Sequence, residues 1–139
     1  MEFEHLIHEP TPTSEDSSRI RGTPIEEGVK ALILRGKSSK KNYQINIPAH
    51  LKLDMKAVSE YVGEKCEFED PAVIRERFGL IIGGVSPFGN LLNLDNYFDE
   101  KILEQPKSDF NCGLSTESII MNSKDLVTLA EGKFGKFSR

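Results

Sequence analysis

Two neighbouring segments of this chain carry apolar residues with the spacing of β-strands. Residues 29–34 are apolar at every position except Lys30, and residues 43–47 carry an apolar side chain at every second position. A polar, basic connection of residues 36–42 joins them. This pattern predicts an antiparallel hairpin, in which alternation places Lys30 and Ala31 on opposite faces.

The remaining pattern predicts further short strands and helices. Short apolar segments predict strands at residues 3–7, 66–68, 97–98, 109–112 and 118–121. Helical spacing between a capping residue and a glycine predicts helices from Asp54 to Gly63, from Asp70 to Gly79, and from Asn122 or Ser123 to Gly132. Shorter helical turns are expected within residues 11–18, 23–26 and 100–103.

The order of these elements indicates the fold class. Strands and short helices alternate irregularly, and the connections are short enough for hairpins. A chain of 139 residues is the size of one domain, and no repeat or linker divides it. We therefore expect one α+β domain over residues 1–139, with a curved, mixed, mostly antiparallel sheet flanked by short helices.

Residues 80–89 form the most distinctive stretch of the chain. An apolar run at residues 80–82 predicts a strand that leads directly into Gly83 and Gly84, and Ser86 and Pro87 follow. Two glycines permit positive φ and leave no Cβ in the way of a ligand, while Pro87 fixes its own φ and favours an extended Ser86. The stretch thus predicts a rigid wall with accessible backbone N–H groups. An ordinary turn at a strand end is the alternative interpretation of the local pattern.

Composition and charge narrow the classes of function. The chain is 37% hydrophobic and 29% charged, and its net charge of −4 argues against binding nucleic acid by bulk attraction. Two basic clusters nevertheless occur, and each is either a solvated segment or a patch that contacts phosphate. Their members are Arg35, Lys37, Lys40 and Lys41, and Lys133, Lys136 and Arg139.

Targeting signals and conventional catalytic motifs are missing from the sequence. No apolar run approaches the about 18 residues of a membrane span, and the acidic N-terminal segment differs from a signal peptide. Cys66 and Cys112 form no CxxC pair, and we interpret Cys112 as a buried structural thiol. The three histidines have no nearby serine elbow or partner acid at a recognisable spacing. We expect a cytoplasmic protein with no metal site and no cofactor.

Several motifs together resemble one known family. The loop at residues 83–89 and the strand at 30–34 resemble the YbaK/ProX family of aminoacyl-tRNA trans-editing deacylases, relatives of the editing insertion of bacterial prolyl-tRNA synthetase. Further matches run in order along nearly the whole chain, at residues 8–11, 21–24, 48–49, 53–54, 111–113 and 116–118. The resemblance implies the YbaK/prolyl-tRNA synthetase-associated domain fold.

The resemblance also implies an activity and its residues. Lys30 would be the essential lysine, and the Gly-x-x-x-Pro loop would consist of Gly83, Gly84, Val85, Ser86 and Pro87. The family hydrolyses the ester that joins a wrongly attached amino acid to the 3′ end of tRNA. Such an ester is labile, so preorganised N–H groups, worth about 3 kcal/mol for one donor in a protease, and positioning by Lys30 suit the task. We assign no general base.

Other residues of the resemblance bear on the substrate. Ala31, Asn111, Gly113 and Thr116 are expected to bind it. The branch that acts on Cys-tRNA(Pro) tends to have Thr after the lysine and Ser-Gly-Gly in place of Asn111-Cys112-Gly113. These departures favour a small amino acid such as alanine, serine, threonine or 2-aminobutyrate, with a Cys-tRNA(Pro) deacylase as the alternative.

The implied partner is the acceptor end of a mischarged tRNA, with an aminoacyl-tRNA synthetase as an optional second partner and no membrane. An editing-like module that binds tRNA or a synthetase without catalysis is the alternative from another class. Lys30 and the intact loop argue against it, because a scaffold needs neither.

Overall fold

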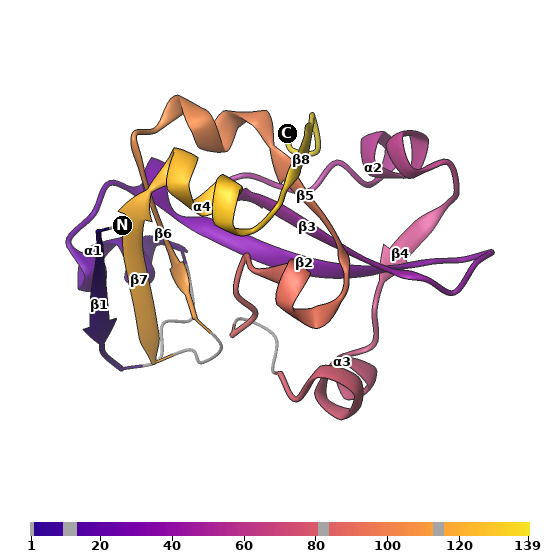
Figure 1. Cartoon of the computed structure of the whole chain (residues 1–139), viewed down its shortest axis with the longest axis horizontal. Helices are drawn as coiled ribbons and strands as arrows, with labels where there is room; N and C mark the ends of the chain where they lie inside the picture. Colours follow the sequence, from indigo (N-terminus) through magenta and orange to yellow (C-terminus); the bar gives the residue numbers. More distant parts are fainter. Residues whose placement is uncertain (1, 10–13, 81–83, 113–115) are drawn as a thin grey trace.

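The larger of two sheets is built on the predicted hairpin. The structure is a computed structural model, and it describes residues 2–9, 14–80, 84–112 and 116–139. Strands β2 (Val29–Gly36) and β3 (Asn42–Pro48) pair antiparallel, with Lys30 opposite Ile47. The sheet order is β4-β2-β3-β5-β8, with β5 and β8 added in parallel (Figure 1). The three further strands are β4 (Cys66–Phe68), β5 (Asp95–Asp99) and β8 (Lys133–Gly135).

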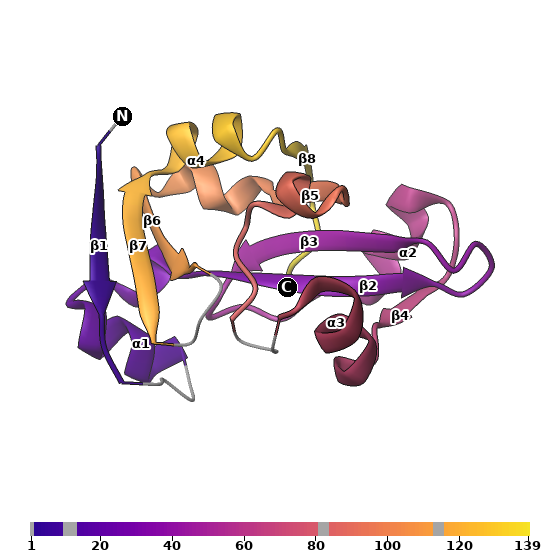
Figure 2. The same ribbon diagram turned by 60° about the horizontal axis from the view of Figure 1, so that its bottom comes forward.

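A smaller antiparallel sheet stands beside the start of β2. Its order is β1-β7-β6, with β1 at an edge. The strands are β1 (Phe3–Ile7), β6 (Lys107–Asn111) and β7 (Glu117–Asn122). An isolated parallel bridge between Gly28 and Asp109 joins the two sheets. The mixed, mostly antiparallel α+β fold is confirmed, but the strands of the described residues are divided between two sheets (Figure 2).

Local signals define the helix ends. The four α-helices are α1 (Ser14–Arg21), α2 (Met55–Val62), α3 (Pro71–Phe78) and α4 (Ser123–Leu129), within the part of the chain that the structure describes. Short 3-10 helices occupy Ile25–Glu27, Gly89–Leu92 and Glu100–Glu104. Asp54 accepts from the Ala57 N–H to cap α2, and Gly63 ends that helix at φ 87°. Asn122 caps α4, as one of the two predicted candidates.

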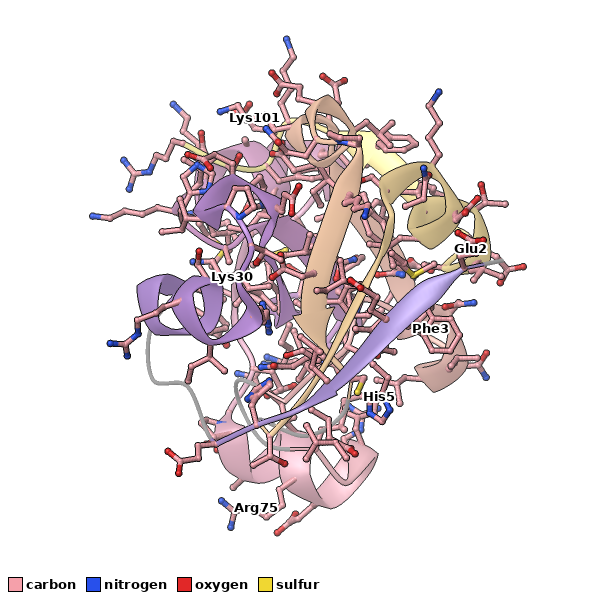
Figure 3. The ribbon with its side chains drawn as sticks, turned by 90° about the vertical axis from the view of Figure 1, so that its left-hand side faces the viewer. Glu2, Phe3, His5, Lys30, Arg75 and Lys101 are labelled. Carbon is pink, nitrogen blue, oxygen red and sulfur yellow. The ribbon has the colours of Figure 1, made fainter. Side chains whose placement is uncertain are left out.

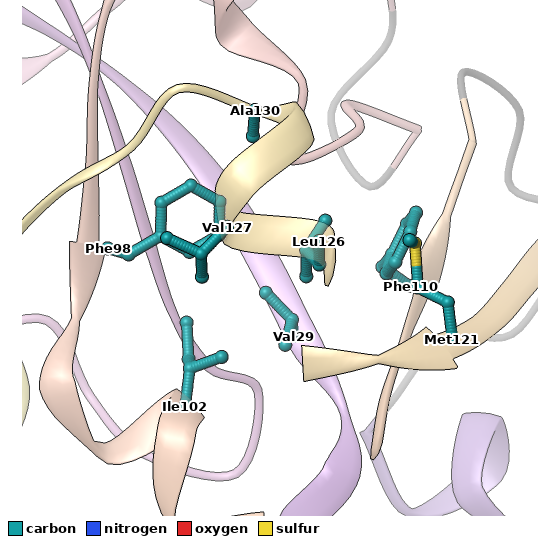
Figure 4. Close-up of a cluster of buried hydrophobic side chains, with 8 residues drawn as sticks. All are labelled: Val29, Phe98, Ile102, Phe110, Met121, Leu126, Val127 and Ala130. Carbon is teal, nitrogen blue, oxygen red and sulfur yellow. The ribbon is translucent and has the colours of Figure 1, made fainter. Parts of the chain in front are cut away.

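Three apolar clusters fix the layers. One cluster links both sheets to α4, with side chains from β2, β5, β6 and β7 (Figure 4). It comprises Val29, Phe98, Ile102, Phe110, Met121, Leu126, Val127 and Ala130. On β2, Leu34 packs with Val58 of α2, whereas Ile33 packs with Ile74 of α3. Because adjacent residues in a strand point to opposite faces, α2 and α3 cover opposite faces of the five-stranded sheet.

Two parts of the fold differ from the sequence-based expectation. The basic segment that contains Lys133 forms strand β8, and the nearby Phe137 is fully buried. Leu80 is not in a strand, and residues 81–83 lie outside the described residues. None of the helices that the structure describes is long and apolar enough to cross a membrane.

Candidate functional site

Lys30 is a half-buried lysine without a counter-ion among the described residues. It is the second residue of β2, at the end of that strand next to the three-stranded sheet (Figures 1 and 3). Burial lowers the pKa of its ammonium group, and no ion pair or hydrogen bond to a described residue offsets that effect. A partly desolvated cation with no internal partner is suited to binding an external anion.

The glycine loop carries backbone donors that have no partner among the described residues. Gly84, Val85 and Pro87 are buried, and Ser86 is half-buried. The N–H groups of Gly84, Val85 and Ser86 form no hydrogen bond with any residue that the structure describes. Gly83, which we also expected in the site, lies outside the described residues. Three consecutive donors of this kind can stabilise a negatively charged oxygen.

Buried amides hold the far side of this loop. The Gln44 amide donates to the Ser86 carbonyl oxygen at 2.8 Å, and the Asn96 amide donates to the Pro87 carbonyl oxygen at 2.8 Å. Asn46 donates to Asn96 at 2.7 Å and accepts from Gln44 at 3.0 Å. All three amide side chains are buried. They form a connected network, here called the amide network, that fixes two loop carbonyls from inside the protein.

The next glycine is required for that network. A Cβ on Gly89 would lie 2.8 Å from the Cδ and Oε1 atoms of Gln44 and 3.0 Å from Oδ1 of Asn96. These amides are themselves fixed by hydrogen bonds, so they have little freedom to move away. Gly89 therefore allows the loop to pack directly on the amide network.

The two faces of β2 separate the predicted site residues. Ala31 pairs with Asn46, and Ile33 pairs with Gln44, so these four side chains share the face that holds the loop. Ala31 packs against the apolar cluster that includes Val85. Lys30 lies on the other face, and no hydrogen bond or ion pair between described residues joins it to residues 84–87. The structure thus brings Ala31 beside the loop and places Lys30 at the sheet boundary.

Asn111 is held by a buried arginine. Arg21, at the end of α1, donates to Asn111 Oδ1 at 2.8 Å and to Ser118 Oγ at 2.8 Å. The same guanidinium forms an ion pair with Asp109, and both side chains are almost fully buried. Thr116 is half-buried, and its carbonyl oxygen accepts from the N–H of His8. Gly113 lies outside the described residues.

His8 has a partner that the sequence did not reveal. Its Nδ1 atom lies 2.7 Å from the Glu9 carbonyl oxygen, which can only accept, so Nδ1 carries the proton. In neutral His8, Nε2 then accepts from the Ser118 hydroxyl at 2.6 Å. The two residues are 110 positions apart, so this pairing has no recognisable spacing in the sequence. Ser118 has no exposed surface, so this pair positions β7 and does not present a nucleophile.

A second set of side chains also departs from the sequence-based expectation. His5, Cys112 and Glu117 each place one possible metal-ligand atom within 4.8 Å of the others. We expected no such cluster, because the three residues have no metal-ligand spacing in the sequence. Cys112 directly follows β6 and is half-buried rather than part of a regular strand. Burial raises the pKa of its thiol.

The first basic cluster is partly neutralised. Arg35 forms an ion pair with Glu67, and Lys41 forms one with Asp95. Lys37 and Lys40 remain exposed at the turn between β2 and β3. This turn therefore offers less positive charge for phosphate than the sequence suggests.

Sequence reasoning missed the amide network and the Arg21 ion pair. Gln44 and Asn46 alternate with apolar residues, a pattern that normally indicates a solvent-facing side of a strand. Every residue of β3 is nevertheless buried. Arg21 and Asp109 are separated by 88 positions, so no local signal joins them.

Comparison with known proteins gives a family and a fold. A family model described as the aminoacyl-tRNA editing domain matches residues 8–129. A "Multifunctional Ser/Thr-tRNA deacylase ProXp-y" of Escherichia coli K12 is 26% identical over 142 residues, covering 99% of this chain and 85% of that protein. A "Prolyl-tRNA editing protein ProX" of Acetoanaerobium sticklandii is 22% identical over 137 residues, covering 95% of this chain and 84% of that protein.

Solved structures agree on the fold. A crystal structure described as a candidate trans-editing enzyme for prolyl-tRNA synthetase superposes with a TM-score of 0.85 at 22% identity, covering 99% of this chain and 87% of that one. The crystal structure of a hypothetical protein superposes with a TM-score of 0.88 at 22% identity, covering 100% of this chain and 93% of that one. At this level of identity the two structures support the fold alone.

Proposed function

The chain belongs to the aminoacyl-tRNA editing domain family, and from that premise we propose that it hydrolyses the ester of mischarged tRNA that carries a small amino acid. It acts in trans, as a free-standing deacylase that protects translation fidelity. The observation that carries the proposal is that the consecutive N–H groups of Gly84, Val85 and Ser86 form no hydrogen bond with any described residue, while the amide network holds the Ser86 and Pro87 carbonyls.

These donors supply the electrostatic part of the reaction. When water attacks the aminoacyl carbonyl, negative charge develops on the carbonyl oxygen, and N–H groups already aimed at that position stabilise it without reorganisation. The amide network keeps the Ser86 and Pro87 carbonyls turned into the protein, which limits rearrangement of the peptide units. In this proposal Gly83, Gly84, Val85, Ser86 and Pro87 form the wall that binds the ester.

Lys30 holds the tRNA end. A terminal phosphate or ribose oxygen next to its half-buried ammonium group would restore the favourable environment that burial removes. In this proposal Lys30, at the boundary between the sheets, grips the nucleotide while the ester lies against the wall. Lys30 thus contributes positioning.

No side chain is assigned as the general base. The aminoacyl ester is already labile, so binding, orientation and oxyanion stabilisation provide enough of the rate acceleration for a water molecule to react. His8 is engaged with Ser118 and Glu9, which makes it a structural residue in this account.

The pocket is proposed to select small amino acids. Ala31 packs against the cluster that contains Val85, so its side chain borders the wall. Asn111 is oriented by Arg21, and together with Gly113 and Thr116 it is proposed to contact the aminoacyl group. A deacylase for Cys-tRNA(Pro) is the alternative within the same reaction. The name of the Escherichia coli relative, a Ser/Thr-tRNA deacylase, supports the broader small-residue assignment.

The proposed partner is the acceptor end of a mischarged tRNA, with a synthetase as an optional second partner. The proposed site of action is the cytoplasm, where such tRNA is used.

A deacylation assay over a panel of mischarged tRNAs tests the proposal. Hydrolysis of small aminoacyl esters that depends on Lys30 supports it, and binding without hydrolysis favours the non-catalytic module.

A further inference from the structure

We propose that His5, Cys112 and Glu117 form a binding site for a thiophilic divalent cation of the zinc class. The three residues come from different parts of the three-stranded sheet: β1, the position after β6, and the start of β7. One ligand atom from each lies within 4.8 Å of the other two. The proposal does not depend on the deacylase activity.

Strand register explains why the three side chains meet. Ile7 pairs with Glu117, and His5 lies two residues before Ile7 on β1, so His5 and Glu117 project from the same face. The N–H of Cys112 donates to the Glu117 carbonyl oxygen at 3.3 Å, which brings Cys112 opposite Glu117. The cluster therefore follows from backbone pairing. Figure 3 shows His5 on β1.

The spacing of the donor atoms fits a tetrahedral ion. His5 Nε2 and Glu117 Oε1 are 3.5 Å apart. Two ligands bound to one tetrahedral zinc at its usual bond lengths are separated by about 3.4 Å. A cation could therefore bridge these two atoms with little movement, and the thiol needs only to approach within the same radius.

The donor chemistry favours zinc over magnesium or calcium. An imidazole nitrogen, a thiolate and a carboxylate are all common zinc ligands, and thiolate disfavours hard cations. Three protein ligands leave the fourth tetrahedral position open to water or to another ligand. The pKa of the Cys112 thiol is raised by burial and by the Glu117 carboxylate, so a bound dication would be needed to favour the thiolate.

An ion can reach this position from solvent. The His5 side chain is 47% exposed, and the Glu117 side chain is 29% exposed. Binding would connect the edge strand β1 to both strands of the β6–β7 pair, because each contributes a neighbouring ligand. A ligand that binds only the folded state raises stability by mass action, so zinc should raise the unfolding temperature.

The test uses Zn²⁺ and Co²⁺ with the purified full chain. Co²⁺ should give a thiolate-to-metal absorption band, and Zn²⁺ should displace it with one ion per chain. Cys112→Ser should remove the band, and His5→Ala and Glu117→Gln should each weaken Zn²⁺ binding by at least about tenfold, since even residues behind the ligands often matter that much. Cys66→Ser, His50→Ala and Glu4→Gln serve as matched controls and should leave binding unchanged.

Two results would overturn the site. One is the absence of stoichiometric Zn²⁺ binding at micromolar concentrations. The other is binding that persists in all three ligand variants or is lost equally in the controls. Circular dichroism establishes that each variant is folded. Glu117→Gln keeps the shape of a partly exposed side chain, so it provides the decisive comparison if Cys112→Ser fails to fold.

Discussion

The side-chain amide of Gln44 donates a 2.8 Å hydrogen bond to the carbonyl oxygen of Ser86, 42 positions further along the chain. This bond ties the central strand β3 to the glycine loop. Together with the bond from Asn96 to Pro87, it fixes the direction of the loop backbone before any substrate binds. Donors fixed in this way are more effective in stabilising an oxyanion than donors that must reorient.

Replacing Gln44 tests the value of this arrangement. Gln44→Leu keeps most of the volume but leaves the Ser86 carbonyl and the Asn46 Oδ1 without that donor. We expect a loss of about 1–3 kcal/mol of unfolding free energy, together with a lower kcat for deacylation. Urea unfolding and single-turnover hydrolysis measure the two effects. A variant that loses stability but keeps the wild-type kcat would show that the amide network stabilises the fold and does not contribute to catalysis.

Gly84 and Ala31 should affect different properties of the enzyme. Gly84→Val adds a branched side chain to the buried wall and should slow hydrolysis of every substrate alike. Enlarging Ala31 should instead change the preference among small amino acids, by about 1–3 kcal/mol for each methylene. Rates with alanyl, seryl, threonyl and cysteinyl esters distinguish the two. Uniform losses for both variants would argue that Ala31 does not border the aminoacyl group.

Arg21 should be important for stability. Its guanidinium pairs with the buried Asp109 carboxylate, and Arg21→Met would leave that carboxylate without its counter-ion. Breaking a buried pair from one side costs about 3–5 kcal/mol, so a large drop in unfolding temperature is expected. The exposed Arg75 provides a control, since Arg75→Met should change stability little. Equal small shifts in both variants would contradict the role given to the pair.

The lowered pKa of Lys30 has a consequence for stability. Since burial disfavours the charged form in the folded state, the unfolded state binds the proton more tightly. The charged Lys30 therefore lowers the free energy of unfolding by its full amount at any pH below its pKa in the folded state. This destabilisation is relieved as the pH rises towards the ordinary lysine pKa of about 10.4. Lys30→Met should be at least as stable as the wild type at neutral pH, with an advantage that shrinks in alkali. A variant less stable at pH 7 would indicate that Lys30 contributes mainly through packing.

Local signals in the sequence were sufficient for much of the fold. Asp54 and Gly63 define both ends of α2 through a side-chain cap and a positive φ, which depend on neighbouring residues alone. The β2–β3 hairpin follows from alternation and a short connection. The division into two sheets could not be predicted in this way, because it depends on pairing between distant segments, such as β1 with β7.

The parts of the candidate site that are continuous in the sequence could be predicted, whereas the parts built from residues far apart in the sequence could not. The glycine loop is a continuous motif, so its position was visible in the sequence. The amide network needs Gln44, Asn46 and Asn96 from two strands, and buried amides have the same alternation as exposed ones. The pairing of His8 with Ser118 spans 110 positions and could be found only in the folded chain.

The most direct test of the account compares deacylation by the wild type, Lys30→Ala and Lys37→Ala on alanyl, seryl, threonyl, cysteinyl and phenylalanyl tRNAs. Lys37 is an exposed lysine near the other end of the hairpin and controls for the loss of one positive charge. We predict that Lys30→Ala stays folded but loses most of its deacylase activity, whereas Lys37→Ala keeps the activity of the wild type. We also predict that esters of small amino acids react faster than the phenylalanyl ester. A folded Lys30→Ala protein with wild-type rates, or a wild type that binds these tRNAs without hydrolysing any of them, would contradict this account.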